Sequence, residues 1–192
     1  MRDKITKDKI FRTTPKVKYL NALLGRLETE YIPVLNLIIK HNSENERSIG
    51  FWSLMRIIFP VIETVATVIG KKKEDFLEQD LHVPFGHIVW EIYRHSLMHT
   101  DELRYAVYKG KTISWGAHIS IEGTGHFIRR HTKLHPTTIH LDISELYFSL
   151  QKFIKNEVVK NDETPINIQV GIHFPDQESK LQKDLEELYT NY

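Results

Sequence analysis

Apolar residues recur at spacings of three and four over the first half of the chain, which is typical of amphipathic helices. The pattern predicts a first helix over 14–40 that kinks or restarts at Pro33. It predicts a second helix over 48–69, which is apolar on almost every side, so we expect it at the centre of the fold. A third helix follows Pro84 and ends by Gly110.

The second half of the chain changes to an alternation of apolar and polar residues, which is typical of strands. Three such segments predict a hairpin or a three-stranded meander: 112–121, 125–130 and 137–141. A helix capped by Asp142 or Ser144 then runs to Val158, followed by a strand at 166–174 and a charged helix from Pro175. The predicted fold class is α+β, mainly α, with a small C-terminal β hairpin or sheet and two further helices.

The composition is that of a soluble globular protein. Of the 192 residues 41% are hydrophobic and 27% are charged, and no stretch reaches the roughly 20 consecutive apolar residues of a membrane span. The segment Met1–Lys18 is basic and lacks the apolar core of a signal peptide. The chain has no cysteine, which excludes disulfides, thiolate catalysis and Cys-based zinc sites. We therefore expect a soluble, cytoplasmic protein with no membrane contact.

We expect one domain with appendages. It comprises a basic N-terminal arm at 1–14, a helical bundle at 15–110 and a β-containing extension at 111–192 that belongs to the same domain. The net charge of +1 is distributed unevenly, because Met1–Lys18 holds seven Lys and Arg residues against two Asp. A basic arm is suited to contact phosphates, and a solvated terminus is the alternative.

The third predicted helix carries the motif Tyr93–His99, in which one arginine and two histidines lie among residues that would otherwise build a core. Residues five apart on an ideal α-helix are separated by about 140°, so Arg94 and His99 do not share one face. A second copy of the helix across a two-fold axis would supply the surface between them. The spacing therefore predicts a homodimer with a composite site.

Two other interpretations of this motif stay open. His95 and His99 are four apart, which is the spacing of helical zinc sites, although the sequence marks no third ligand. Alternatively, His99 is a hydrogen-bonded core histidine and Arg94 forms a buried ion pair. The carboxylates proposed for that pair are Glu63, Glu91 and Asp101.

The motif Tyr93–His99, on a helix preceded by apolar helices, resembles the Arg-x4-6-His motif of the HEPN superfamily. These helical-bundle proteins include many metal-independent ribonucleases of toxin, defence and RNA-processing systems. The resemblance covers roughly Pro15–Lys109, and the family's minimal bundle lacks the β-containing part. It implies a polar residue after the arginine, which His95 supplies. It also implies a bundle glutamate that pairs with the arginine, for which Glu63 is the candidate.

The resemblance implies a HEPN-like endoribonuclease that uses no metal or other cofactor. Such cleavage needs a base for the 2′-hydroxyl, a cation for the charge on the phosphorane and an acid for the 5′-oxygen. His99 is the expected acid or base, Arg94 the cation and His95 an orienting group, with a 2′,3′-cyclic phosphate as product. The expected partners are RNA, a second copy of the chain, and an antitoxin or regulatory protein. The alternative is a non-catalytic module of the same architecture that binds nucleic acid or protein.

Further residues are candidates for nucleic-acid contact. A small basic patch suited to phosphates is expected beside the predicted hairpin, with a solvated hairpin tip as the alternative, and its residues are Arg129, Arg130 and Lys133. Trp52 and Trp90 lie in apolar helices and are expected in the core, whereas Trp115 is expected to be partly exposed.

Overall fold

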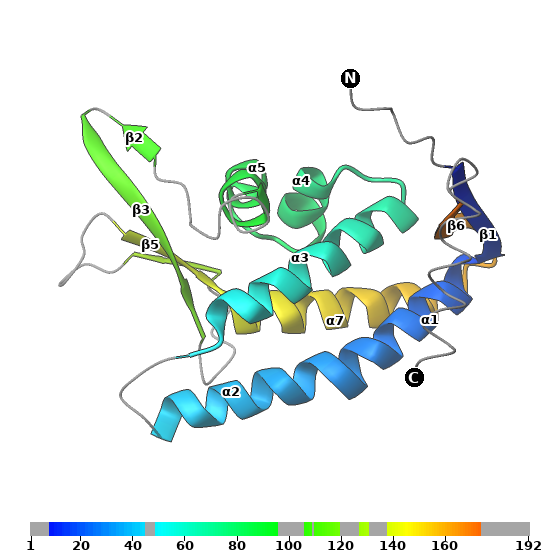
Figure 1. Ribbon diagram of the computed structural model, residues 1–192, viewed down its shortest axis with the longest axis horizontal. Coiled ribbons are helices and arrows are strands. Elements are labelled where there is room, and N and C mark those ends of the chain that lie inside the picture. Colours follow the sequence, from blue (N-terminus) through cyan, green and yellow to red (C-terminus); the bar gives the residue numbers. More distant parts are fainter. Residues whose placement is uncertain are drawn as a thin grey trace, which may run out of the picture. The chain divides into compact units, whose positions relative to one another are not determined.

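The computed structural model describes residues 8–44, 49–95, 106–108, 110–119, 127–130 and 138–173 (Figure 1). The chain forms two compact units, one of Val17–Asp162 and one of its two ends, Met1–Lys16 with Glu163–Tyr192. This division follows residues 16 and 162, whereas the sequence analysis divides the chain after residues 14 and 110. The helices and the strands of the larger unit belong together, and the fold class is α+β and mainly helical, as predicted.

The first helical segment continues through Pro33, where the sequence predicts a kink or a restart. It consists of α1 (Lys16–Arg26), the π-helical turn η1 (Leu27–Tyr31) and α2 (Ile32–Glu44). Pro33 has no backbone N–H to donate. The wider turn before it is closed by the Ile32 N–H, which donates to the Leu27 carbonyl, and the helix continues from there.

The second predicted helix is α3 (Phe51–Val68), which begins slightly later than the pattern suggests. Gly50 precedes it with φ +82°, and a Cβ at that position would lie 2.7 Å from Ile38 Cδ1. The connection between α2 and α3 therefore requires glycine, both for its backbone angle and for the space it leaves. At the other end Gly70, with φ +73°, follows the helix where the sequence predicts its end.

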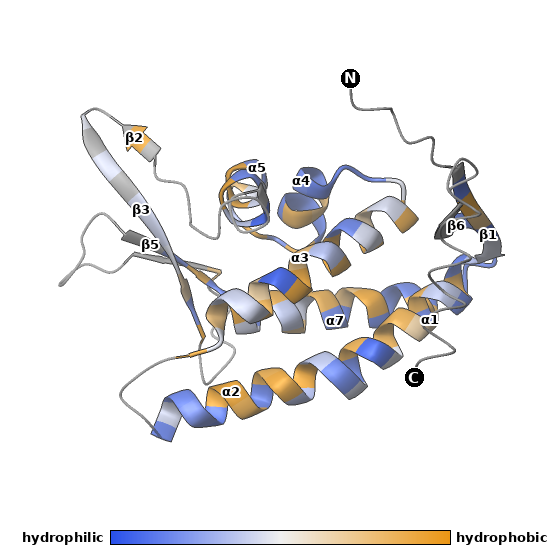
Figure 2. Ribbon diagram, in the orientation of Figure 1, coloured by the Kyte–Doolittle hydropathy of each residue, from blue (hydrophilic) through white to orange (hydrophobic). Residues whose placement is uncertain are grey.

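α3 supplies the centre of the hydrophobic core of the larger unit. Figure 2 shows hydrophobic residues along most of its length, and it contacts α4, α7, η3 and β3, whose bounds follow below. By length and composition α3 is the one described helix apolar enough to cross a membrane, yet 50% of that span is buried inside the protein. This burial is that of a core helix in a soluble protein.

Two short segments follow α3, and each begins as an α-helical turn and continues as a π-helical turn. They are α4 (Lys73–Asp75) with η2 (Phe76–Asp80), and α5 (Gly86–Val89) with η3 (Trp90–His95). Gly86 permits their close approach, because a Cβ there would lie 2.5 Å from the backbone oxygen of Glu74. The second segment is the described part of the helix predicted after Pro84.

The helix predicted after the strands is α7 (Ile143–Val159), and its predicted cap is confirmed. Asp142 Oδ1 accepts a hydrogen bond from the Glu145 N–H at 3.3 Å, which satisfies one donor of the first turn. Farther along, the Tyr147 hydroxyl donates to the Leu54 carbonyl of α3 at 2.9 Å, and burial raises the pKa of Tyr147. Apolar packing and this hydrogen bond together hold α7 against α3.

The four-stranded sheet of the larger unit has the order β2-β3-β5-β4, so the predicted pairing of strands in chain order was wrong. Its strands are β2 (Ala106–Tyr108), β3 (Lys111–His118), β4 (Ile128–Arg130) and β5 (Thr138–Asp142). β3 pairs with β5 in parallel, and β4 pairs antiparallel with the other edge of β5. β5 therefore lies between the two segments that the sequence predicts as hairpin partners. Alternation fixes the face of each strand but not its neighbour.

The smaller unit contains a two-stranded antiparallel sheet of β1 (Asp8–Pro15) and β6 (Pro165–His173). β6 confirms the strand predicted near the C-terminus. The described part of the predicted basic arm, by contrast, is a strand rather than a solvated segment. Its partner lies far away in the sequence: Thr13 Oγ1 donates to Asn167 Oδ1 at 2.8 Å across 154 residues. A pairing this distant leaves no local signal in the arm itself.

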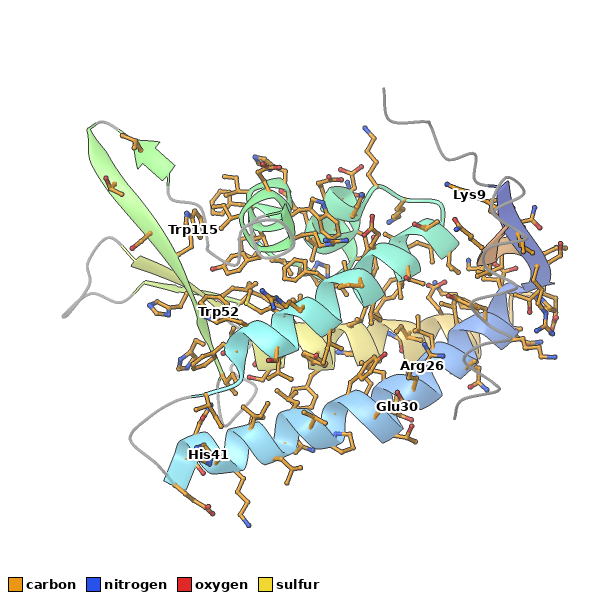
Figure 3. All side chains as sticks on the ribbon, in the orientation of Figure 1. Lys9, Arg26, Glu30, His41, Trp52 and Trp115 are labelled. Carbon is orange, nitrogen blue, oxygen red and sulfur yellow. The ribbon has the colours of Figure 1, made fainter. Side chains whose placement is uncertain are left out.

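The three tryptophans differ in burial (Figure 3). Trp90 is buried and Trp115 is partly exposed, as expected. Trp52 is 42% exposed, so the expectation of a core position was wrong. It lies in the first turn of α3, ahead of Leu54, where the buried face of that helix begins.

Candidate anion-binding site around Arg94

Three charged side chains from separate helical segments meet in the larger unit. Glu63 belongs to α3, Lys73 opens α4 and Arg94 belongs to η3. Glu63 Oε1 accepts a hydrogen bond from Lys73 Nζ at 2.8 Å, and Glu63 Oε2 accepts one from Arg94 Nη2 at 3.2 Å. The exposed fractions are 35% for Glu63, 39% for Lys73 and 21% for Arg94. The carboxylate therefore links the motif segment to the central helix while both cations keep contact with solvent.

The ring of Trp90 lies beneath both cations. Lys73 Nζ is 5.0 Å and Arg94 Cζ is 6.0 Å from its centroid, distances at which a cation is attracted to the face of an aromatic ring. Trp90 is 3% exposed, and its ring packs against that of Phe59 in α3 at 5.8 Å. The aromatic surface under the charges is thus part of the core and is held in place by it.

Tyr93, next to Arg94, fastens the motif segment on two sides. Its ring stacks on Phe59 of α3 at 6.3 Å with an interplanar angle of 7°. It also meets the Trp115 ring edge-on at 6.3 Å. Its hydroxyl donates to the Gly116 carbonyl of β3 at 2.7 Å, and burial raises the pKa of this phenol. Because η3 is held by α3 and by the sheet, the position of Arg94 is set by the fold rather than by its own side-chain contacts.

The charges of the cluster favour an anion. Burial raises the pKa of the Glu63 carboxyl, but the hydrogen bonds and charges of Lys73 and Arg94 outweigh burial and bring this pKa below its usual value. Glu63 is therefore ionised at neutral pH, and the two cations leave a net charge of +1. Arg94 Nε is buried and has no hydrogen-bond partner among the described residues. A guanidinium with spare donors beside a solvent-accessible ammonium is suited to hold phosphate oxygens.

The structure describes only part of the predicted site. It brings Arg94 and Glu63 together, as both the ion-pair interpretation and the HEPN resemblance require. His95 is the last residue of η3 and its side chain lies outside the described part of the structure, as His99 does entirely. Two arginines of the predicted basic patch belong to the backbone of β4, but no side chain of that patch is described: Arg129, Arg130 and Lys133.

The winding of the motif segment changes the geometry expected from its spacing. η3 is π-helical over Trp90–His95, and in such a turn each N–H pairs with the carbonyl five residues earlier rather than four. Residues five apart then approach one face, whereas about 140° separates them on an α-helix. The prediction of a homodimer from the spacing of Arg94 and His99 thus assumed a winding that the chain does not have at Arg94.

Sequence analysis missed two members of the cluster. Lys73 ends a run of three lysines after Gly70, which the sequence marks only as positive charge following the second helix. Trp90 was assigned to the core, which is correct, but its exposure to two cations on one face leaves no trace in a hydrophobic pattern. Both contacts arise because α4 and η3 pack beside each other along α3, and this packing is tertiary.

No family of known proteins, no curated protein and no solved structure matches this chain. Among the residues that the structure describes, no group of three or more His, Asp or Glu side chains is placed to hold a metal ion. The chemistry supplied by the described cluster is the binding of an anion by Arg94 and Lys73 over an aromatic surface.

Proposed function

We propose that this protein is a HEPN-like, metal-independent endoribonuclease that works as a cytoplasmic homodimer in a toxin, defence or RNA-processing system. The ion pair between Arg94 and Glu63 carries the proposal, because the HEPN resemblance implies a bundle glutamate at the motif arginine. These residues are 31 positions apart in the sequence, so their contact is a property of the fold. Lys73 adds a second cation to the same place, which suits a site for a phosphodiester.

In this proposal Arg94 holds the scissile phosphate. Its spare donors contact two non-bridging oxygens and stabilise the negative charge that builds up on the pentavalent phosphorus. Glu63 fixes the guanidinium from the opposite side, and Lys73 raises the local positive potential. Trp90 supports both cations from below. Glu63 and Trp90 are positioning residues, since they act through Arg94.

The histidines supply the proton transfers in the proposed reaction. His99 removes the proton from the 2′-hydroxyl, and the resulting oxygen attacks the adjacent phosphorus. The bond from phosphorus to the 5′-oxygen breaks, and that oxygen takes a proton from an imidazolium, which His95 or the partner copy of His99 can provide. The products are a 2′,3′-cyclic phosphate and a 5′-hydroxyl. No metal takes part in these steps.

The test is cleavage of single-stranded RNA in the presence of EDTA. Arg94→Ala and His99→Ala should each abolish cleavage, while Lys152→Ala, which removes an exposed cation from α7, should leave it unchanged. Circular dichroism and the melting temperature establish that each variant is folded. Full activity of a folded Arg94→Ala protein would refute the proposal. Size-exclusion chromatography with light scattering tests the homodimer separately.

A non-catalytic module that binds nucleic acid or a partner protein is the second candidate. The observation in its favour is that Glu63 and Trp90 already engage the guanidinium of Arg94, as they would in a purely structural ion pair. This candidate predicts that the wild-type protein binds RNA, or an antitoxin-like regulatory protein, without cleaving RNA. Binding with no cyclic-phosphate product would select it over the nuclease.

A further inference from the structure

A second polar cavity lies in the larger unit, between the first helical segment and α3. Its volume is about 320 Å³, and Glu63, Lys73 and Arg94 do not line it. The polar side chains at its walls come from α1, η1 and α3, and they are Tyr19, Arg26, Tyr31, Arg56 and Thr64. Figure 3 labels Arg26 on α1. This volume is at the lower end of the range of small-molecule sites, so it suits one ligand of nucleotide size.

The charged groups of the cavity are of one sign. Arg26 and Arg56 are both exposed and both line it, and none of the described residues that line it is acidic. Two guanidinium groups that converge on one space match the oxygens of a phosphate, which each can hold through two parallel hydrogen bonds. A neutral or cationic ligand would leave these charges uncompensated.

The rest of the wall suits an aromatic ring. Tyr19 and Tyr31 are half-buried, and the surface between them is formed by Leu, Ile, Pro and Val side chains. Aromatic side chains with an apolar floor stack nucleobases without regard to sequence. The Thr64 hydroxyl donates to the Pro60 carbonyl at 2.9 Å, so its oxygen faces other groups as an acceptor. The cavity thus joins a place for phosphate to a place for a base.

The π-helical turn η1 explains how the cavity is assembled. Arg26 and Tyr31 are five residues apart and flank this turn. On an unbroken α-helix about 140° would separate them, and they would not line one cavity. The i to i+5 winding brings them onto one side. Widened turns of this kind are found frequently at functional sites, and here the turn places a cation beside an aromatic ring.

We propose that this cavity binds one nucleotide, with its phosphate held by Arg26 and Arg56 and its base against Tyr19 and Tyr31. The nucleotide is either a free mononucleotide or one unit of an RNA strand, since both present the same phosphate and base. The proposal goes beyond the nuclease activity and does not depend on it, because it uses neither Arg94 nor the histidines.

The experiment is isothermal titration calorimetry of the folded, full-length protein with AMP, UMP, adenosine and a short single-stranded RNA. AMP and UMP should bind, adenosine should bind about tenfold or more weakly than AMP, and Arg26→Gln with Arg56→Gln should weaken AMP by a similar factor. Lys152→Gln and Arg94→Ala are the controls and should leave AMP binding unchanged. Retained binding in Arg94→Ala separates this cavity from the proposed nuclease site.

The single variant Arg26→Gln provides the same comparison if the double variant does not fold, because Arg26 is exposed on α1. Amide NMR shifts on AMP addition should change at Tyr31 and Thr64 and not at Lys73. Binding of RNA with no binding of mononucleotides would assign the cavity to a strand, and the reverse would assign it to a free ligand. If neither binds at millimolar concentration, or if both bind equally well to the arginine variants, the proposal is wrong.

Discussion

Replacing Glu63 by glutamine removes the carboxylate that Lys73 and Arg94 share and keeps the size of the side chain. Glu63 is 35% exposed, so solvent screens both pairs, and each contributes about 0.5–1 kcal/mol. The two cations over Trp90 then lack their counter-charge. We expect a loss of about 1–2 kcal/mol in the free energy of unfolding, or roughly 2–8 °C in melting temperature for a unit of this size.

The same substitution should separate binding from cleavage. The net charge of the cluster rises from +1 to +2, so RNA should bind Glu63→Gln more tightly at low salt, with a steeper dependence on salt concentration. Cleavage should fall, because Arg94 loses the contact that orients it. The assays are fluorescence anisotropy at two salt concentrations and RNA cleavage in EDTA. Unchanged melting, binding and cleavage together would refute the electrostatic argument.

The pH dependence of stability follows from the same carboxylate. Its pKa in the folded protein lies below the ordinary value of 4.5, so the stability it contributes is present above that pH and is lost as the pH falls through the folded pKa. The difference in melting temperature between the wild type and Glu63→Gln should therefore shrink as the pH is lowered below about 4.5. A constant difference across this range would contradict the assignment of the shift to these ion pairs.

Two further substitutions test the structural support of the site. Tyr93→Phe leaves the Gly116 carbonyl without its hydrogen bond at 2.7 Å and should cost about 1–3 kcal/mol in urea unfolding. Gly50→Ala should destabilise the protein because its Cβ would meet Ile38 at 2.7 Å and φ is +82°. The matched control is Gly25→Ala in α1, where nothing lies within 4 Å of the added Cβ, and it should stabilise by about 0.5–1 kcal/mol. Equal effects of the two alanines would contradict this account of Gly50.

The parts of the fold that could be predicted are those governed by local pattern. α3 and α7 keep a helical spacing of apolar residues over several turns, and Asp142 caps α7 because its side chain lies just before the first turn. The order of the strands in the sheet could not be predicted in this way. The parallel pairing of β3 with β5 depends on which edge each strand meets after the chain has folded.

The candidate site was predictable to a similar degree. The cost of burying a cation drew attention to Arg94, and the resemblance of its motif selected Glu63 from several acidic residues. Lys73 was not predicted, because it reaches the site from a short segment that has no periodicity. The π-helical turns η1 and η3 also lacked a signal, since apolar spacing does not distinguish a hydrogen bond to the fifth residue from one to the fourth.

The most direct test of the central claim is the rate of RNA cleavage in EDTA by the wild-type protein and by Arg94→Ala, measured side by side with analysis of the product ends. The account predicts metal-free cleavage that leaves 2′,3′-cyclic phosphate and 5′-hydroxyl ends. It also predicts a loss of about a hundredfold or more on removal of the guanidinium. Cleavage by a folded Arg94→Ala protein at the wild-type rate, or products that form only when a metal is added, would contradict it.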